Sequence, residues 1–142
     1  MSKVVSNPGE CVPVEYRNII QKAHTEEFEF PLLHMEDYWW LFESRQGITK
    51  GFAGARPETD DCVFLGPCVV FPEFRGQGVQ RTLIRARERL AVGNKFIGAL
   101  TYAHYKNYKS LNNFIRNGYR IIPNWEKDQS SDGTYIYLRK DF

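Results

Sequence analysis

One segment of the chain, residues 70–81, combines a β-rich run, two glycines and the start of a helical pattern. It reads VFPEFRGQGVQR, and Gly76 and Gly78 allow the backbone to approach a bound group closely. The N–H groups of such a turn and of the first helical residues point outward together, which favours an anion such as a pyrophosphate. No Lys-Ser or Lys-Thr follows the glycines and no third glycine stands at dinucleotide-fold spacing, so the P-loop and the Rossmann fingerprint are excluded.

A second set of reactive side chains follows a β-rich run over residues 95–103. Tyr102 and His104 are two residues apart on a predicted strand, so their side chains share a face, and Tyr105 and Tyr108 follow. Imidazole exchanges protons near neutral pH, which makes His104 a candidate general base, acting directly or through water. Tyr108 or Tyr102 is the candidate acid. A histidine that only packs at the end of a strand is the open alternative.

The elements that position these residues follow from hydrophobic periodicity and from glycine and proline signals. Strands are predicted over 3–6, 38–45, 50–56, 62–71, 95–103, 119–122 and 134–138, and helices over 13–23, 78–92 and 108–116. Residues 24–38 form either an irregular helical segment or an ordered loop. The order predicts a mixed sheet with helices packed on it.

Two of the predicted helices have an expected buried face. Helix 13–23 would bury Val14, Ile19 and Ile20. Helix 78–92 would bury Val79, Leu83, Ala86 and Leu90, with Arg81, Arg85 and Arg89 largely opposite, and Gly93 would end it as a left-handed residue.

Composition limits the class of protein. The chain has 142 residues, 42% of them hydrophobic, which suits one domain over residues 1–142. Its longest apolar run, Val63 to Phe71, is interrupted by Gly66 and Pro67 and is far shorter than the ~20 residues of a membrane span. With no secretory signal read at the N-terminus, a soluble cytoplasmic protein is predicted.

Three cysteines (Cys11, Cys62, Cys68) cannot all pair, so reduced thiols are expected, and scattered histidines predict no metal site.

Charge is distributed unevenly along the chain. Residues 1–61 carry 6 Lys and Arg against 11 Asp and Glu, whereas residues 62–142 carry 13 against 6. This asymmetry is compatible with two ligands of opposite charge, and equally with charges that only decorate solvated faces.

Two motifs resemble those of the GNAT superfamily of N-acetyltransferases. Residues 70–81 are similar to its acetyl-CoA motif, with Val70, Pro72, Arg75, Gly76 and Gly78 in register and Gln80 where the family usually has Gly or Ala. A second family motif is similar to the set Asn107, Ser110, Phe114, Gly118 and Tyr119, and Gly51-Phe52-Ala53 resembles the start of the family's third strand. The resemblance spans at least residue 38 to the C-terminus.

The resemblance implies an α+β fold with a mostly antiparallel central sheet, flanked by helices, whose fourth and fifth strands splay apart around the pantetheine arm of acetyl-CoA. Backbone groups of Cys68, Val69 and Val70 would hold the pantetheine and the acetyl carbonyl. The pyrophosphate would be held by Gly76, Gln77, Gly78, Val79, Gln80 and Arg81, with Arg75 and Ser110 in the matching motifs. Asn107 would contact the co-substrate near its thiol end.

The activity implied is transfer of an acetyl group from acetyl-CoA to a primary amine by direct attack. Two positions depart from the family pattern: Phe114 replaces the tyrosine usually proposed as acid, and Tyr102 stands where some protein N-terminal acetyltransferases carry glutamate. A cationic amine would be attracted by the acidic residues Glu26, Glu27, Glu29, Glu36, Asp37 and Glu43. Trp39, Trp40 and Trp125 would line an acceptor cleft by cation–π contact or serve as packing residues.

Two other functions stay open. One is a non-catalytic GNAT-fold protein that binds an acyl-CoA or a protein partner. The other is an acetyltransferase acting on an RNA-linked amine, with positive charge supplied by Arg81, Arg85, Arg87, Arg89, Lys106, Lys109, Arg116 and Arg120. No membrane partner is expected, and a homodimer stays open.

Overall fold

A computed structural model of the chain describes residues 1–124 and 133–142. Its elements follow the predicted order: β1 (Ser2–Ser6), α1 (Val14–Phe28), β2 (Trp39–Arg45), β3 (Ile48–Pro57), β4 (Cys62–Val70), α2 (Val79–Gly93), β5 (Gly98–His104), α3 (Tyr108–Arg116), β6 (Arg120–Ile122) and β7 (Tyr135–Asp141). Short 3-10 turns cover Met35–Asp37 and Pro72–Phe74. No helix of the described residues is long and apolar enough to cross a membrane.

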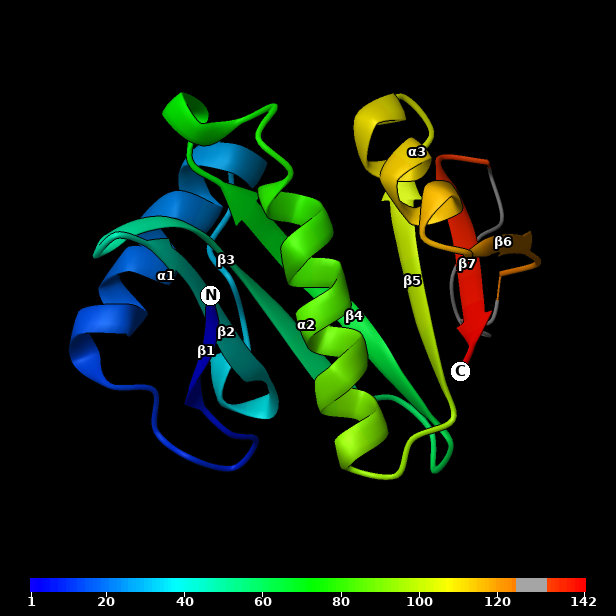
Figure 1. Cartoon of the computed structure of the whole chain (residues 1–142), viewed down its shortest axis with the longest axis horizontal. Helices are drawn as coiled ribbons and strands as arrows, with labels where there is room; N and C mark the ends of the chain where they lie inside the picture. Colours follow the sequence, from blue (N-terminus) through cyan, green and yellow to red (C-terminus); the bar gives the residue numbers. More distant parts are fainter. Residues whose placement is uncertain (125–132) are drawn as a thin grey trace.

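The strands form one mixed sheet in the order β1-β2-β3-β4-β5-β7-β6. All neighbours are antiparallel except β4 and β5, whose parallel pairing covers only Cys62–Phe64 against Gly98–Leu100. Beyond these pairs the two strands diverge toward their carboxyl ends, as Figure 1 shows. The predicted mixed, mostly antiparallel sheet with splayed fourth and fifth strands is therefore confirmed.

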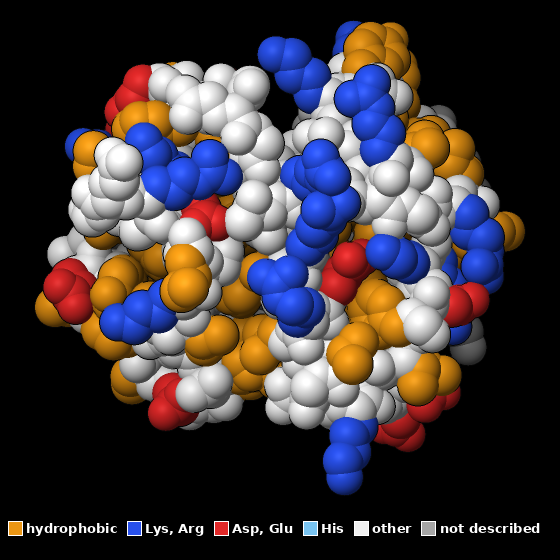
Figure 2. All heavy atoms as spheres, in the orientation of Figure 1, with side chains coloured by type: hydrophobic (Ala, Val, Ile, Leu, Met, Phe, Trp, Pro, Cys, Tyr) orange, Lys and Arg blue, Asp and Glu red, His pale blue; other side chains and the backbone are white. Residues whose placement is uncertain are grey.

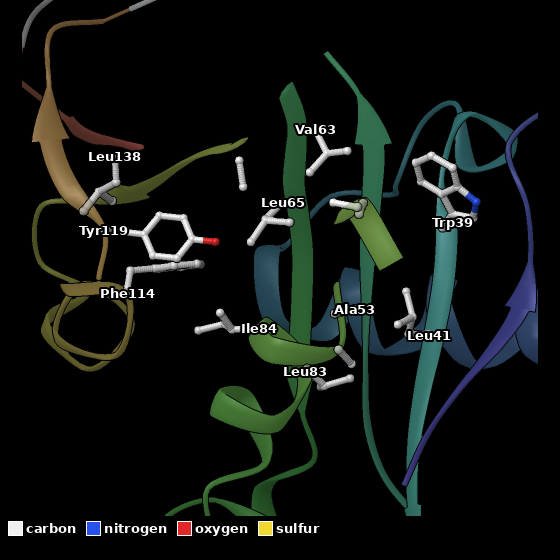
Figure 3. Packing of buried hydrophobic residues seen from close by; sticks show 14 of the residues in the cluster. Trp39, Leu41, Ala53, Val63, Leu65, Leu83, Ile84, Phe114, Tyr119 and Leu138 are labelled. Atoms are coloured by element: carbon white, nitrogen blue, oxygen red, sulfur yellow. The ribbon is translucent and has the colours of Figure 1, made fainter. Parts of the chain in front are cut away.

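Helices cover both faces of the sheet because its strands alternate two sets of apolar side chains. On β2, Trp39 and Leu41 belong to the cluster under α2 and α3, whereas Trp40 and Phe42 belong to the cluster that packs against α1. Figure 3 shows the first cluster. Trp39 and Trp40 are 8% and 0% exposed, so of the two predicted alternatives packing holds for both rather than the acceptor cleft. Trp125 lies outside the described residues.

Helix α1 differs from its prediction in length and in its buried face. It continues beyond residue 23 to Phe28 and ends at Glu29, which takes a left-handed conformation and donates its N–H to the Thr25 carbonyl. Ile20 is buried as predicted, but Val14 is 66% exposed and Ile19 is 38% exposed. His24, one turn after Ile20, completes the buried face, because residues four apart lie on the same side of a helix.

Helix α2 buries Val79, Leu83 and Ala86 as predicted. The prediction for Gly93 is wrong, since the helix includes that glycine. The chain turns into the left-handed region at Lys95 instead, and the Asn94 side chain donates to the Leu90 carbonyl at 2.8 Å. The left-handed turn at Lys95 lets the Phe96 N–H donate to the Ala91 carbonyl at 3.0 Å, so the last carbonyls of the helix are satisfied without a glycine.

Candidate functional site

The turn between β4 and α2 has the backbone geometry of an anion cradle. Gly76 and Gly78 have φ angles of +78° and +77°, and a Cβ on either would meet no described atom within 4 Å. Helical hydrogen bonding begins where Thr82 N donates to the Gly78 carbonyl at 3.1 Å. The N–H groups of Val79, Gln80 and Arg81 precede this bond, so the helix leaves them without an internal acceptor. The open side of the turn therefore presents backbone donors at a helix N-terminus, where negative charge is favoured.

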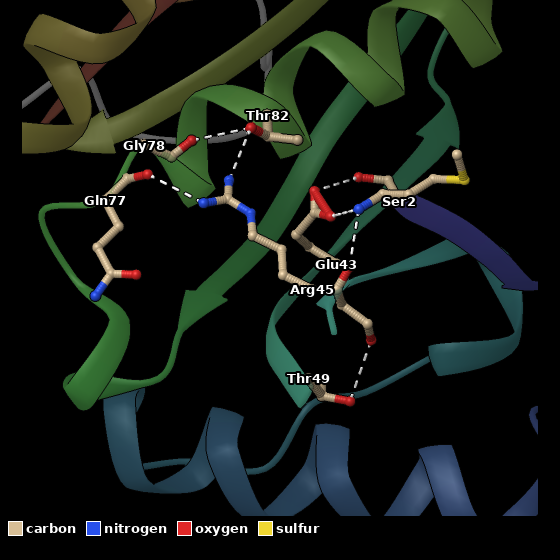
Figure 4. Close-up of polar contacts among 9 residues, drawn as sticks. Ser2, Glu43, Arg45, Thr49, Gln77, Gly78 and Thr82 are labelled. Carbon is tan, nitrogen blue, oxygen red and sulfur yellow. Dashed lines mark hydrogen bonds and ion pairs between the residues drawn. The ribbon is translucent and has the colours of Figure 1, made fainter. Parts of the chain in front are cut away.

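Arg45, at the end of β2, contacts the carbonyl side of this turn. Its guanidinium donates to the Gln77 carbonyl and to the Thr82 hydroxyl, both at 3.4 Å, and the Thr82 hydroxyl donates to the Gly78 carbonyl at 3.1 Å (Figure 4). These bonds engage carbonyls of the turn and leave its N–H groups for a ligand. The sequence analysis missed Arg45 because only the sheet topology brings β2 beside this turn.

Arg75 holds the beginning of the same turn. Its Nε donates to the Val70 carbonyl at 3.2 Å, and its Nη2 pairs with the Glu27 carboxylate of α1 at 3.0 Å. Both side chains are about half exposed, at 49% and 42%, so solvent weakens the pair. Arg75 thus connects the end of β4, the turn and the end of α1.

The carboxyl end of β4 borders the opening in the sheet. Residues 68–70 pair with residues 51–53 of β3, while β5 has already diverged on their other side. Thr101 of β5 donates its hydroxyl to the Leu65 carbonyl at 2.9 Å, close to where the two strands separate. Alternate backbone groups of residues 68–70 therefore face the opening rather than a strand, as the predicted pantetheine contacts of Cys68, Val69 and Val70 require.

Helices α2 and α3, one on each side of the opening, are joined by a side-chain amide. Gln80 donates to the Ser110 hydroxyl at 3.0 Å and accepts from the Asn113 amide at 2.8 Å. Asn107 caps α3 by accepting the Ser110 N–H at 3.3 Å. The side chain of Gln80 is thus engaged by α3, and its backbone N–H is the part that belongs to the cradle.

Of the three residues proposed for proton transfer, Tyr102 and His104 share one face of β5, whereas Tyr108 stands apart on α3. The Tyr102 ring stacks on Phe64 at 5.3 Å between centroids, and His104 lies on the same face of β5, 5.9 Å from the Tyr135 ring. Tyr108 is the first residue of α3 and is 67% exposed.

The backbone near His104 decides which ring nitrogen carries its proton. The Lys106 N–H donates to Nδ1 of His104 at 3.1 Å, so in the neutral ring the proton resides on Nε2. The ring in this arrangement offers a donor at Nε2, rather than the free lone pair that a general base needs.

Phe114 lies in the core and is only 4% exposed, with its ring edge-on to Tyr119 at 5.1 Å. The hydroxyl of Tyr119 donates to the Glu88 carboxylate at 2.9 Å. Burial raises the pKa of Tyr119 above its usual range, and the neighbouring Glu88 carboxylate adds to this shift. Because Tyr119 is only 3% exposed and its hydroxyl is engaged by Glu88, it is a packing residue and does not take the place of the tyrosine that Phe114 replaces.

The acidic and basic residues that the sequence analysis named as surface charges are exposed, with two exceptions. Lys and Arg side chains gather over α2 in Figure 2, and Arg81, Arg85 and Arg89 are exposed there. Arg87 is 0% exposed, so its predicted place on a basic surface is wrong. Glu43 is also 0% exposed and pairs with the Met1 ammonium group (Figure 4), so it cannot attract an amine from solvent as predicted.

Solved structures share this architecture. A Klebsiella pneumoniae protein named as an acyl-CoA N-acyltransferase has a TM-score of 0.79 and 16% identity, covering 99% of this chain and 96% of its own. An aminoglycoside 6'-N-acetyltransferase complexed with coenzyme A has a TM-score of 0.76 and 12% identity (99% and 96%). The Escherichia coli ribosomal-protein-S18-alanine N-acetyltransferase has a TM-score of 0.70 and 16% identity (99% and 94%).

At these identities the likeness establishes the fold alone. No curated protein sequence matches the chain significantly. The family model described as acetyltransferase (GNAT) family matches residues 11–119, which include the cradle, the splayed strands and α3. The chain therefore belongs to the GNAT acetyltransferase family.

Proposed function

We propose that this protein transfers an acetyl group from acetyl-CoA to a primary amine. The observation that carries the proposal is the continuity of two features. The turn formed by Gly76 and Gly78 offers backbone donors suited to a pyrophosphate, and residues 68–70, whose side away from β3 faces the opening, precede it by one short 3-10 turn. A single extended ligand with a pyrophosphate and an amide-bearing arm, which is the form of acetyl-CoA, fits this arrangement.

The reaction is a direct displacement at the thioester. The amine nitrogen attacks the acetyl carbonyl carbon, a C–N bond forms, and the C–S bond breaks to release the CoA thiolate. A cationic amine first loses one proton to water, which frees the lone pair of its nitrogen, and the nitrogen loses a second proton to water as the amide forms. Backbone N–H groups of residues 68–70 that face the opening would stabilise the negative charge that develops on the carbonyl oxygen.

His104 takes a donor role in this proposal. With Lys106 N–H on Nδ1, the Nε2–H of His104 would donate toward the leaving sulfur, and Tyr102 on the same strand face is the second candidate donor. This replaces the base role that the sequence suggested for His104. Tyr108, exposed at the start of α3, is the third candidate donor.

The amine would arrive as a cation from the side of α1. Glu26, Glu27 and Glu29 are exposed at the carboxyl end of that helix, and Glu27 is tied to the cradle through Arg75. A negative potential at this end raises the local concentration of a cationic acceptor.

A second function is favoured by one specific observation. Because Phe114 is packed in the core where the family usually has a tyrosine, the fold could serve a protein that binds acyl-CoA without turnover.

Two measurements test the proposal and separate these functions. Isothermal titration with acetyl-CoA is expected to show binding at one site per chain. A thiol-release assay over polyamines, aminoglycosides, amino acids and basic peptides is expected to show turnover with at least one class. Binding without release over the whole panel would support the non-catalytic function, and absence of binding would refute both.

A further inference from the structure

Helix α2 carries a charged side chain into the interior. Arg87 is 0% exposed, and its Nη1 donates to the carbonyls of Gly54 at 3.1 Å and Gly66 at 3.4 Å. Its Nε donates to the Leu83 carbonyl at 3.2 Å. A buried guanidinium is costly unless it is well paired. These backbone acceptors pair Nη1 and Nε, while Nη2 is buried without a hydrogen-bond partner among the described residues.

The two main acceptors lie where the ladder between β3 and β4 is irregular. The register moves from Ala53↔Cys68 to Ala55↔Leu65, so two residues of β4, Gly66 and Pro67, stand opposite Gly54. Proline has no N–H to donate to a neighbouring strand. The Gly54 carbonyl therefore lacks the donor that another residue at position 67 would supply, and Arg87 donates to it instead.

The opposite face of this bulge is covered by a ring. A Cβ added to Gly66 would lie 2.7 Å from Cε1 of Tyr38, and one added to Gly54 would lie 3.1 Å from Cδ1. Tyr38 thus contacts the bulge from the α1 side of the sheet, while Arg87 holds it from the α2 side. The next residues along the chain are 68–70, the part of β4 that faces the opening.

We propose that Arg87 is a positioning residue that fixes the bulge of β4 and thereby places residues 68–70 for acetyl-CoA. The inference rests on the proposed function and adds a residue outside the family motifs. The positive charge of Arg87 also acts on Cys68, the first residue of β4 beyond the bulge. Burial raises the pKa of the Cys68 thiol, and the nearby Arg87 guanidinium opposes that rise. A displacement of ~1 Å at a reacting group costs up to about 100-fold in rate, so the position of this backbone matters.

The first test compares Arg87→Met with Arg85→Met, an exposed arginine on the same helix. Arg87→Met is expected to lower kcat about 10- to 100-fold and to raise the Kd for acetyl-CoA, because the bulge loses its side-chain donor. Arg87→Lys, which keeps one charged donor, is expected to be intermediate. Arg85→Met is expected to stay within about 2-fold of the natural protein, as exposed sites usually do. A folded Arg87→Met protein with unchanged kcat and Kd would overturn the proposal.

The second test uses Pro67→Ala, which restores an N–H opposite Gly54. In this background Arg87→Met is expected to cost much less than in the natural sequence, because the restored amide supplies the donor. Equal losses in both backgrounds would overturn the proposal. If Arg87→Met alone fails to fold, the double variant Pro67→Ala/Arg87→Met replaces it in the test. This double variant is expected to fold and to bind acetyl-CoA, and its failure to fold would contradict the positioning role of Arg87.

A readout without ligand separates this inference from the proposed function. Amide hydrogen exchange of the ladder amides between residues 68–70 and residues 51–53 in Arg87→Lys is expected to be faster than in the natural protein, with β7 amides unchanged. If the natural protein does not bind acetyl-CoA, the proposed function fails, whereas this exchange pattern still shows whether Arg87 holds the strand. Unchanged exchange in β4 would overturn the positioning role.

Discussion

Replacing Gly78 by alanine separates the stability of the cradle from its ability to bind. Gly78 has a φ of +77°, where an alanine costs about 1–2 kcal/mol. The added Cβ would meet no described atom within 4 Å, so steric overlap adds nothing to this cost. For a chain of this length the expected fall in Tm is about 3–7 °C. The methyl group would, however, occupy the side of the turn on which a pyrophosphate must approach the N–H groups, so we expect at least a ~10-fold rise in the Kd for CoA, about 1.4 kcal/mol.

Gly9→Ala is the matched control. Gly9 has a φ of +85° in the loop between β1 and α1, and a Cβ there also meets no described atom within 4 Å. Both variants should lose similar stability in chemical denaturation, but only Gly78→Ala should lose affinity in isothermal titration. Unchanged CoA binding by Gly78→Ala, or an equal loss in both variants, would refute the assignment of this turn to the pyrophosphate.

Three further predictions concern the site and the core. Arg45→Met removes two 3.4 Å contacts at the cradle and is expected to weaken CoA binding about 3- to 10-fold by titration, whereas an unchanged Kd would show that the turn holds its shape alone. His104→Ala is expected to lower kcat about 10- to 100-fold. The acidic limb of the pH–rate profile, which reports a general base, is expected to persist in this variant, and its loss would show that His104 is the base. Burial lowers the pKa of His24, so the unfolded chain binds a proton that the folded chain does not, and the free energy of unfolding is expected to fall as pH drops below about 6.5. His24→Asn should reduce this pH dependence in denaturation curves, and an identical pH dependence would contradict it.

The order of strands and helices could be predicted because its signals are local. Pro72 marks the end of β4, Gly118 follows α3, and the side-chain period changes from two to nearly four at Val79. The errors arose where a long-range contact decides the outcome. Charge periodicity places Arg87 on a basic surface because it cannot show that two strand carbonyls lie within hydrogen-bond reach beneath that helix position.

The shape of the turn at the candidate site could be predicted in the same way, whereas the roles of its residues stay predictions. The glycine spacing identified the cradle, since backbone conformation there depends on residue type. The engagement of Gln80 with Ser110 and Asn113 could not be predicted, because these side chains meet only after two helices pack beside the opening. The donor state of His104 depends on the Lys106 N–H, which a turn after β5 directs at the ring.

The short parallel pairing of β4 with β5 has a consequence for the folding order. Strands β2, β3 and β4 follow one another through short turns and pair in that order, whereas β4 and β5 pair only after α2 has crossed the sheet. Contacts distant in sequence form late because the loop-closure entropy must be overcome first. The hairpins of β2, β3 and β4 are therefore expected to assemble before the three residue pairs at Cys62–Phe64 join β5 to them. The divergence at which acetyl-CoA is proposed to bind leaves β4 and β5 with one brief connection, which is expected to form late.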